Sequence, residues 1–129
     1  MTGKLLLDTN AAIRLLQNDR VVGRIVKEAT DVYLASTVLG ELYFGALNSR
    51  HSQLNLQRLE NFAAGLEILV CGSNTAKIYG GIRANLKAAG RPIPLNDVWI
   101  AASALEHDLT LVTRDAHFSF VPNLKTERW

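Results

Sequence analysis

Residues 4–10 read KLLLDTN, and the rest of the chain repeats the pattern that this stretch begins. A short apolar run of this length is typical of a strand in the core of a sheet. The Asp-Thr-Asn that follows suits a turn and a helix N-terminus, because these side chains accept hydrogen bonds from free backbone N–H groups. We therefore expect a strand that passes into a helix just after Asp8.

Short apolar runs and longer amphipathic runs alternate along the chain. Besides residues 4–7, strands are predicted at 32–34, 66–70 and 109–112, with a short edge strand at 124–126. Helices are predicted at residues 11–17, 21–29, 38–47, 52–64 and 73–89, and from Asn96 or Asp97 to residue 107. Ser36 or Thr37 is expected to cap the third helix, and Gly90 to end the fifth. Strands separated by helices imply a parallel sheet covered on both faces, so the predicted fold class is α/β.

The bulk composition excludes several classes of protein. The 129 residues fit one domain, and the lone cysteine, Cys71, excludes a disulfide framework and a Cys-rich zinc site. No apolar run approaches the roughly 18 residues of a membrane span. With 14 Lys and Arg against 12 Asp and Glu, the net charge of +2 indicates neither a strongly basic coat nor an acidic tail. We expect a soluble, cytoplasmic domain whose function depends on particular residues.

Four acidic residues stand at the ends of predicted elements. Asp8 ends the first strand, and Asp115 follows the fourth strand through Thr113. Asp97 lies in the first turn of its helix, and Glu41 lies early in the helix that follows the second strand. In open parallel sheets, ligands bind beyond the carboxyl ends of the strands, where the following helices begin. All four acids are therefore expected to converge at this edge.

Each acid taken singly also has a structural interpretation. Asp8 could cap a turn, Asp97 could complement a helix dipole, and Asp115 could be an ordinary turn residue. Glu41 differs because residues 39–44, LGELYF, surround it with apolar side chains, where a carboxylate lowers stability unless a partner pairs with it.

Four carboxylates gathered in one place require a cation. Two of them about 4 Å apart repel by roughly 4 kcal/mol at an effective dielectric constant near 20. Hard divalent Mg²⁺ or Mn²⁺ prefers such oxygen ligands, whereas no Cys pair or His-x₃-His spacing favours zinc. One or two such ions bind a phosphodiester oxygen, lower the pKa of a water molecule and stabilise the leaving oxyanion. The acids therefore predict metal-dependent hydrolysis of phosphodiesters.

Other α/β enzymes that use carboxylates or phosphates match less well. A receiver domain needs an acid near the middle of the chain, but residues 50–57 read RHSQLNLQ. A haloacid-dehalogenase phosphatase needs a second Asp two residues after the first, where this chain has Asn10. No Gly-rich loop with a following Lys is present to bind a nucleoside triphosphate.

Four segments together resemble the PIN-domain ribonucleases, and among them the VapC-type toxins of bacterial toxin–antitoxin modules. They are residues 5–10 (LLLDTN), 38–42 (VLGEL), 96–102 (NDVWIAA) and 111–115 (LVTRD), in the expected order and spacing. The resemblance covers essentially residues 1–129, as a single PIN domain. It implies an α/β/α sandwich with a central, mainly parallel sheet of four to five short strands. It also implies a Mg²⁺- or Mn²⁺-dependent endoribonuclease that leaves a 5′-phosphate and a 3′-hydroxyl.

The resemblance assigns roles residue by residue. The three core catalytic and metal-binding acids are matched by Asp8, Glu41 and Asp97. Asp115 matches the more variable fourth acid, Thr113 the hydroxyl position that supports the site, and Asn10 the residue that braces the first turn. The implied partners are the RNA substrate and a VapB-like antitoxin whose C-terminal segment wraps the toxin and reaches its active site. Toxin homodimers joined into a larger toxin–antitoxin complex are also implied.

Basic residues and histidines leave alternatives open. Arg83, Lys87 and Arg91 recur every four residues, either as a solvated helix face or as a stripe that binds RNA phosphates. Arg114 is a candidate for a substrate phosphate because it adjoins Asp115. None of the histidines pairs with a Ser or Cys at a recognisable spacing, so we interpret them as surface residues: His51, His107 and His117. The alternative function is a non-catalytic PIN-like module that binds RNA or protein, which the presence of all four acids disfavours.

Overall fold

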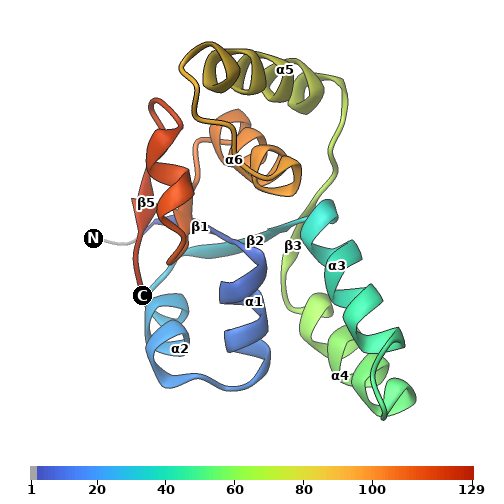
Figure 1. The fold of residues 1–129 in the computed structure, drawn as a ribbon. Helices are drawn as coiled ribbons and strands as arrows, with labels where there is room; N and C mark the ends of the chain where they lie inside the picture. Colours follow the sequence, from blue (N-terminus) through green and yellow to red (C-terminus); the bar gives the residue numbers. More distant parts are fainter. Residues whose placement is uncertain (1–2) are drawn as a thin grey trace.

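The computed structural model describes residues 3–129 (Figure 1). Within these residues the strands are β1 (Lys4–Leu7), β2 (Asp31–Ala35), β3 (Glu67–Leu69), β4 (Thr110–Val112) and β5 (Thr126–Glu127). The α-helices are α1 (Thr9–Leu16), α2 (Arg20–Lys27), α3 (Ser36–Leu47), α4 (Ser52–Ala64), α5 (Ser73–Ala88) and α6 (Leu95–Glu106). A 3₁₀-helix, η1 (Ala116–Phe120), follows β4.

All strand pairs of the sheet are parallel, in the order β3-β2-β1-β4-β5. The chain moves outward from β1 to β3 and then crosses back to β4, on the other side of β1. In Figure 1, α5 and α6 lie above the sheet and α1 and α2 below it, while α3 and α4 form a pair at the lower right. The predicted α/β sandwich with a parallel sheet is therefore confirmed.

The core lies around the central strand. Leu5, Leu6 and Leu7 are buried, and Leu6 lies opposite Tyr33 of β2 and Leu111 of β4. Each fully buried leucine contributes about 1.5–3 kcal/mol by leaving water. A run of apolar residues without alternation is what a strand covered on both faces requires. Among residues 3–129, no helix is both long and apolar enough to span a membrane.

The predicted elements agree with the structure except near several ends. The third helix has no side-chain cap: its N-cap is Ala35, and the Thr37 hydroxyl is buried without a hydrogen-bond partner. The prediction that Ser36 or Thr37 caps this helix is therefore wrong, because the strand passes into the helix without a turn. Gly90 adopts φ +68° directly after the end of α5, as predicted for a helix-ending glycine.

Three further differences lie in the last third of the chain. Helix α6 begins at Leu95 after an N-cap at Pro94, rather than at Asn96 or Asp97. The Pro94 carbonyl accepts the first helical hydrogen bond, from the Val98 N–H group at 3.2 Å, so Asp97 is the third residue of the helix. The last strand is Thr126–Glu127 rather than 124–126, and η1 was not predicted.

Candidate active site

The register between β1 and β4 brings Asp8 beside Thr113. Leu7 pairs with Val112, and the Asp8 N–H group donates to the Val112 carbonyl at 3.2 Å. The next residue of each strand therefore lies at the same level, and the Thr113 hydroxyl donates to Asp8 Oδ2 at 2.6 Å. Thr113 Oγ1 also accepts from the Asp115 N–H group at 3.0 Å. One hydroxyl thus joins the ends of two strands at the point where the sheet order reverses, a preferred ligand site in α/β folds.

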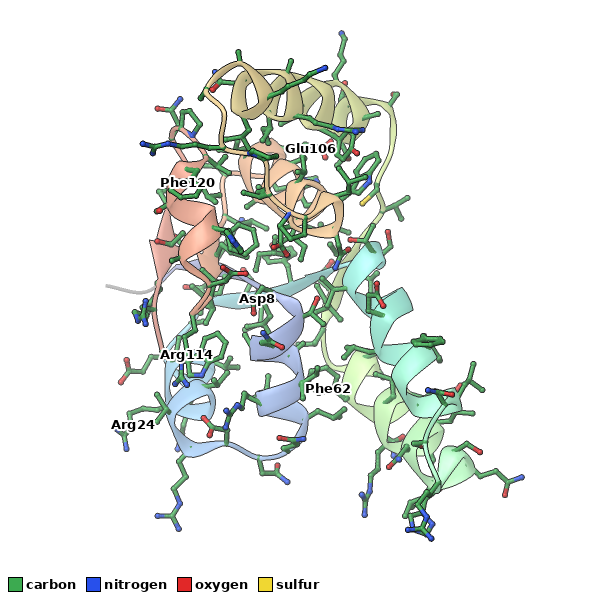
Figure 2. The ribbon with its side chains drawn as sticks, viewed as in Figure 1. Asp8, Arg24, Phe62, Glu106, Arg114 and Phe120 are labelled. Carbon is green, nitrogen blue, oxygen red and sulfur yellow. The ribbon has the colours of Figure 1, made fainter. Side chains whose placement is uncertain are left out.

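Asp8 caps helix α1 and also belongs to a cluster of acidic residues with Asp97 and Asp115. Its Oδ1 accepts a hydrogen bond from the Ala11 N–H group at 2.7 Å, at the N-terminus of α1, and the residue is only 4% exposed. Figure 2 shows Asp8 in the middle of the molecule, where α1 meets the sheet. Burial raises the pKa of this carboxyl group, although the hydrogen bonds from Thr113 and Ala11 act in the opposite direction.

Asp97 reaches the same edge from α6. This helix leads into the start of β4, so its own first turn lies at the carboxyl ends of the strands. The pKa of Asp97 is raised to about 6, first by removal of its carboxyl group from water and then by the negative charges of Asp115 and Asp8. His117 acts in the opposite direction. The three acids Asp8, Asp97 and Asp115 therefore interact electrostatically, and their negative charge is not compensated by the chain alone.

Without divalent metal, the burial of Asp97 and the negative charges near it predict that the chain becomes less stable as the pH rises. The pKa of Asp97 is about 6 in the folded chain against 3.8 for an ordinary Asp, so the folded chain binds the proton more tightly. Its contribution to stability is fully present below pH 3.8 and is lost as the pH rises through about 6. A shift of this size corresponds to a few kcal/mol at most, which solvent screening reduces to about 1 kcal/mol.

This contribution is measured by urea unfolding in EDTA at about pH 4 and about pH 7. In Asp97→Asn the loss of stability between the two pH values is expected to be smaller than in the wild type by about 1 kcal/mol. An equal loss in both proteins would contradict the assignment of this titration to Asp97.

His117 is a member of the site that the sequence did not reveal. It is exposed, as predicted, but its Nδ1 lies 2.9 Å from Asp115 Oδ1, and its backbone N–H group donates to the same oxygen at 2.9 Å. Asp97, Asp115 and His117 each offer a ligand atom, and these atoms lie within 4.8 Å of one another. The available signal was the Asp-x-His spacing at residues 115–117, which becomes meaningful only when η1 turns His117 back over Asp115.

Glu41 occupies a different position from the one expected. Its side chain is exposed on α3, so the argument that apolar neighbours bury its carboxylate is wrong. The neighbouring apolar residues turn inward on one side of the helix, as Val38 and Leu42 do, while Glu41 faces outward. It lines a groove of about 940 Å³ together with residues of α1 and α4. Glu41 does not belong to the Asp97, Asp115 and His117 group, and its catalytic role stays a prediction.

The chain is similar to proteins of a known family. Residues 5–124 match the family described as PIN domain. The chain belongs to the PIN-domain family. It is 33% identical to ribonuclease VapC2 of Haemophilus influenzae and 33% identical to the tRNA(fMet)-specific endonuclease VapC of Shigella flexneri, with 98% of each chain covered in both cases. Among solved structures it is similar to DNA-bound VapBC from Salmonella typhimurium, with a TM-score of 0.90 at 32% identity over 100% of this chain and 99% of that one. This PIN domain is therefore of the VapC type.

The donor set of this PIN domain fits a divalent cation. Two carboxylates and an imidazole face one another, and the pKa of Asp97 is raised first by burial and then by the negative charges of Asp115 and Asp8. A hard cation with mostly oxygen ligands relieves this repulsion without any change of fold. Asp97, Asp115 and His117 are the residues of the described chain best arranged to hold it, with Asp8 beside them.

One predicted supporting residue and one predicted substrate-binding residue line a smaller pocket of this PIN domain. Asn10 and Arg114 border a pocket of about 400 Å³ that also includes Asp115. The Arg114 guanidinium lies over the Trp129 ring, 4.9 Å from its centre, and Arg114 Nε donates to the Trp129 carbonyl at 3.1 Å. The bracing role predicted for Asn10 stays a prediction.

The basic residues at the end of α5 differ in their surroundings. All three are exposed, as a solvated helix face requires: Arg83, Lys87 and Arg91. Arg83 donates to the Tyr79 hydroxyl at 3.3 Å, which directs it along its own helix. The guanidinium carbon of Arg91 lies 5.0 Å from the ring centre of Phe120. Phe120 belongs to η1, the same short helix as His117. Of these three, Arg91 is thus the one that the fold joins to η1, the element that contributes His117 to the acidic cluster.

Proposed function

We propose that this PIN domain, residues 1–129, is a metal-dependent endoribonuclease and the toxin of a toxin–antitoxin pair. The observation that carries the proposal is the meeting of Asp8, Asp97 and Asp115, from three separate elements, at the switch point of the sheet. The names of its relatives, a ribonuclease and a tRNA-specific endonuclease, support RNA as the substrate. Catalysis of this kind needs no side-chain nucleophile, which agrees with the residues around the cluster.

The cofactor is proposed to be one or two Mg²⁺ or Mn²⁺ ions, held by Asp97, Asp115 and His117 with Asp8 and Glu41 as further acids. When bound, such an ion lowers the pKa of a water molecule and stabilises the negative charge on the leaving oxygen. The chain itself orients its acids. Thr113 fixes one oxygen of Asp8 and the backbone before Asp115, and His117 fixes one oxygen of Asp115.

The substrate phosphates are proposed to contact exposed guanidinium and ammonium groups of the chain. These groups belong to Arg114, Arg83, Lys87 and Arg91. Such contacts release counterions from the RNA, so binding weakens as salt increases. Arg114 and Arg91 have the stronger case, because Arg114 adjoins Asp115 and Arg91 contacts η1.

The partner is proposed to be a VapB-like antitoxin, since the solved relatives include VapBC complexes. The groove between α1, α3 and α4 suits an amphipathic segment of such a protein, because Leu16, Leu42 and Phe62 line it beside polar side chains. Ile13 borders both this groove and the pocket at Asp115, so a segment seated in the groove adjoins the acidic site. We also propose that two copies associate, and exposed apolar side chains such as Phe44 and Leu47 offer surface for that contact.

Cleavage of RNA with and without metal tests the function. The purified chain is incubated with structured RNA in Mg²⁺ or Mn²⁺, then in EDTA, then with the metal restored in excess. We expect cleavage that stops in EDTA and returns with the metal, with 5′-phosphate and 3′-hydroxyl ends. A 2′-deoxy substitution at the cut site should still be cleaved, because the 2′-hydroxyl is not the nucleophile in this mechanism.

Three results would contradict the proposal in different ways. Cleavage that persists in EDTA would exclude the metal, and a 2′,3′-cyclic phosphate product would exclude attack by water. RNA binding without cleavage under every metal condition would favour the non-catalytic module. Asp8→Asn controls for a contaminating nuclease, because it removes one negative charge from the cluster with little change of shape.

A further inference from the structure

The pocket beside Asp115 carries features that the proposed cleavage of phosphodiesters does not explain. Six residues line its volume of about 400 Å³: Asn10, Ile13, Arg14, Arg114, Asp115 and Trp129. Its size is within the roughly 300–1,000 Å³ of pockets that bind small molecules. Because Asp115 belongs to both the pocket and the acidic cluster, a ligand in this pocket is adjacent to the groups that would hold the metal.

We propose that this pocket is a nucleotide subsite that accepts one unpaired base of the RNA next to the phosphodiester that is cut. The inference rests on the proposed ribonuclease function and adds to it the recognition of a base. The acidic cluster and the basic helix end, by contrast, contact only the backbone of the substrate. The subsite would therefore give the enzyme a preference for single-stranded positions.

The first argument for a nucleotide is the charge of the pocket walls. Two arginines, Arg14 and Arg114, line the pocket against one carboxylate, that of Asp115. The nearest carboxylate to Arg14 is that of Asp19, at 3.9 Å, and the Arg14 side chain is half exposed, so this ion pair is weak. Arg114 uses Nε for the Trp129 carbonyl, which leaves its terminal N–H groups as donors. Guanidinium groups with free donors bind phosphate oxygens strongly.

The second argument is the planar surface that Arg114 and Trp129 form together. The guanidinium carbon lies 4.9 Å from the centre of the indole ring, so the two flat groups hold one another in place. Proteins that bind single-stranded RNA stack unpaired bases on aromatic rings and on arginine planes. Asn10 also lines the pocket, and its carboxamide both donates and accepts, as the edge of a base requires. In Figure 2, Arg114 lies below Asp8, on the same side of the sheet as α1 and α2.

RNA fits this combination better than a segment of protein does. A nucleotide carries a phosphate for the guanidinium groups and a flat base for the indole within one unit. A peptide provides only part of this combination of phosphate and flat base. The larger groove between α1, α3 and α4 is also the more apolar of the two cavities and better suited to a protein segment.

The test compares two oligonucleotides that differ only in their bases. A single-stranded oligouridylate and an oligomer of abasic ribose phosphates of equal length carry the same charge, and their binding is measured by fluorescence anisotropy in EDTA. The wild-type chain is expected to bind the base-bearing oligomer about tenfold more tightly, which is the size of one stacking contact. Trp129→Ala should abolish this preference, so that the two oligomers bind with equal affinity, while Trp129→Phe should retain most of it.

Arginine variants separate phosphate contacts from base contacts. Arg14→Gln is expected to weaken the binding of both oligomers and to reduce the salt dependence of binding. Arg24→Gln is the matched control, because Arg24 is an exposed arginine on α2 outside the pocket and its loss changes the net charge equally. It should change the affinity for both oligomers and the salt dependence of binding less than Arg14→Gln does, and an equal effect of the two variants would contradict a phosphate contact of Arg14 in the pocket.

The outcomes for the subsite and for the nuclease are independent. Equal affinity of the wild type for the two oligomers, or a preference that survives Trp129→Ala, would overturn the subsite even if the chain cleaves RNA. A base preference that depends on Trp129 supports the subsite even if no cleavage is found. Loss of antitoxin binding in Trp129→Ala with the base preference intact would assign the pocket to the protein partner and overturn the proposal.

Discussion

Replacing Asp97 by asparagine is expected to slow RNA cleavage by about a thousandfold. Asn keeps the shape of the side chain and removes the charge, so the cluster of Asp97, Asp115 and His117 loses one of its two carboxylates. Stabilisation of transition-state charge by a bound cation is worth several kcal/mol, and each 1.36 kcal/mol changes the rate tenfold. The rate is measured under single-turnover conditions with saturating metal.

A direct measurement of metal binding separates a lost ligand from a lost fold. Titration with Mn²⁺, followed by calorimetry, should give a weaker dissociation constant for Asp97→Asn than for the wild type, while metal-free Asp97→Asn should be at least as stable near neutral pH. Asp108→Asn is the matched control, because Asp108 is an exposed aspartate that pairs only at the surface, with Lys125 at 2.8 Å. Full activity in Asp97→Asn would remove this residue from the catalytic group.

Replacing Phe118 by alanine is expected to lower the free energy of unfolding by about 3–5 kcal/mol. Phe118 is 1% exposed and is the largest of the fully buried side chains in the described chain. It also anchors η1, the helix that turns His117 back over Asp115. A loss of this size is a large share of the about 5–15 kcal/mol that stabilises a typical domain. Urea unfolding followed by circular dichroism measures it.

Phe120 provides a control of the same residue type in the same short helix. It is 37% exposed and contacts the guanidinium of Arg91, so Phe120→Ala should cost about 1 kcal/mol or less. Similar losses of unfolding free energy in Phe118→Ala and Phe120→Ala would mean that the cavity left by Phe118 does not cause the loss of stability. A stable Phe118→Ala protein would show that η1 does not depend on this anchor.

The strands could be predicted because a run of apolar residues directly indicates a buried strand. A run of leucines such as residues 5–7 is stable only when both faces of the strand are covered, which already implies helices on each side. The same logic located Asp8, since a polar residue that ends such a run has to leave the core at the edge of the sheet. Helix ends were predicted less well, because Ala35 and Pro94 occupy N-cap positions that sequence patterns assign to polar side chains.

Glu41 and His117 mark the limit of inference from sequence at the site. The apolar neighbours of Glu41 suggested a buried carboxylate, but a helix separates adjacent residues onto different faces, and Glu41 is exposed. His117 lacked a recognisable partner in the sequence, because its partner is two residues away and is reached only through the tight turn of η1.

By itself, the sequence determined the parallel α/β architecture and the residue types at the ends of its strands, because the burial and hydrogen-bond needs of short segments are local properties. Only the tertiary structure decided which of those residues meet. The β1–β4 register joins Asp8 to Thr113, and the crossover to β4 brings Asp97 beside Asp115. The first of these contacts joins residues 105 positions apart and the second joins a residue of α6 to one that follows β4, so no local pattern encodes the side-chain geometry that results. The pocket between Arg114 and Trp129 is a product of the same long-range packing.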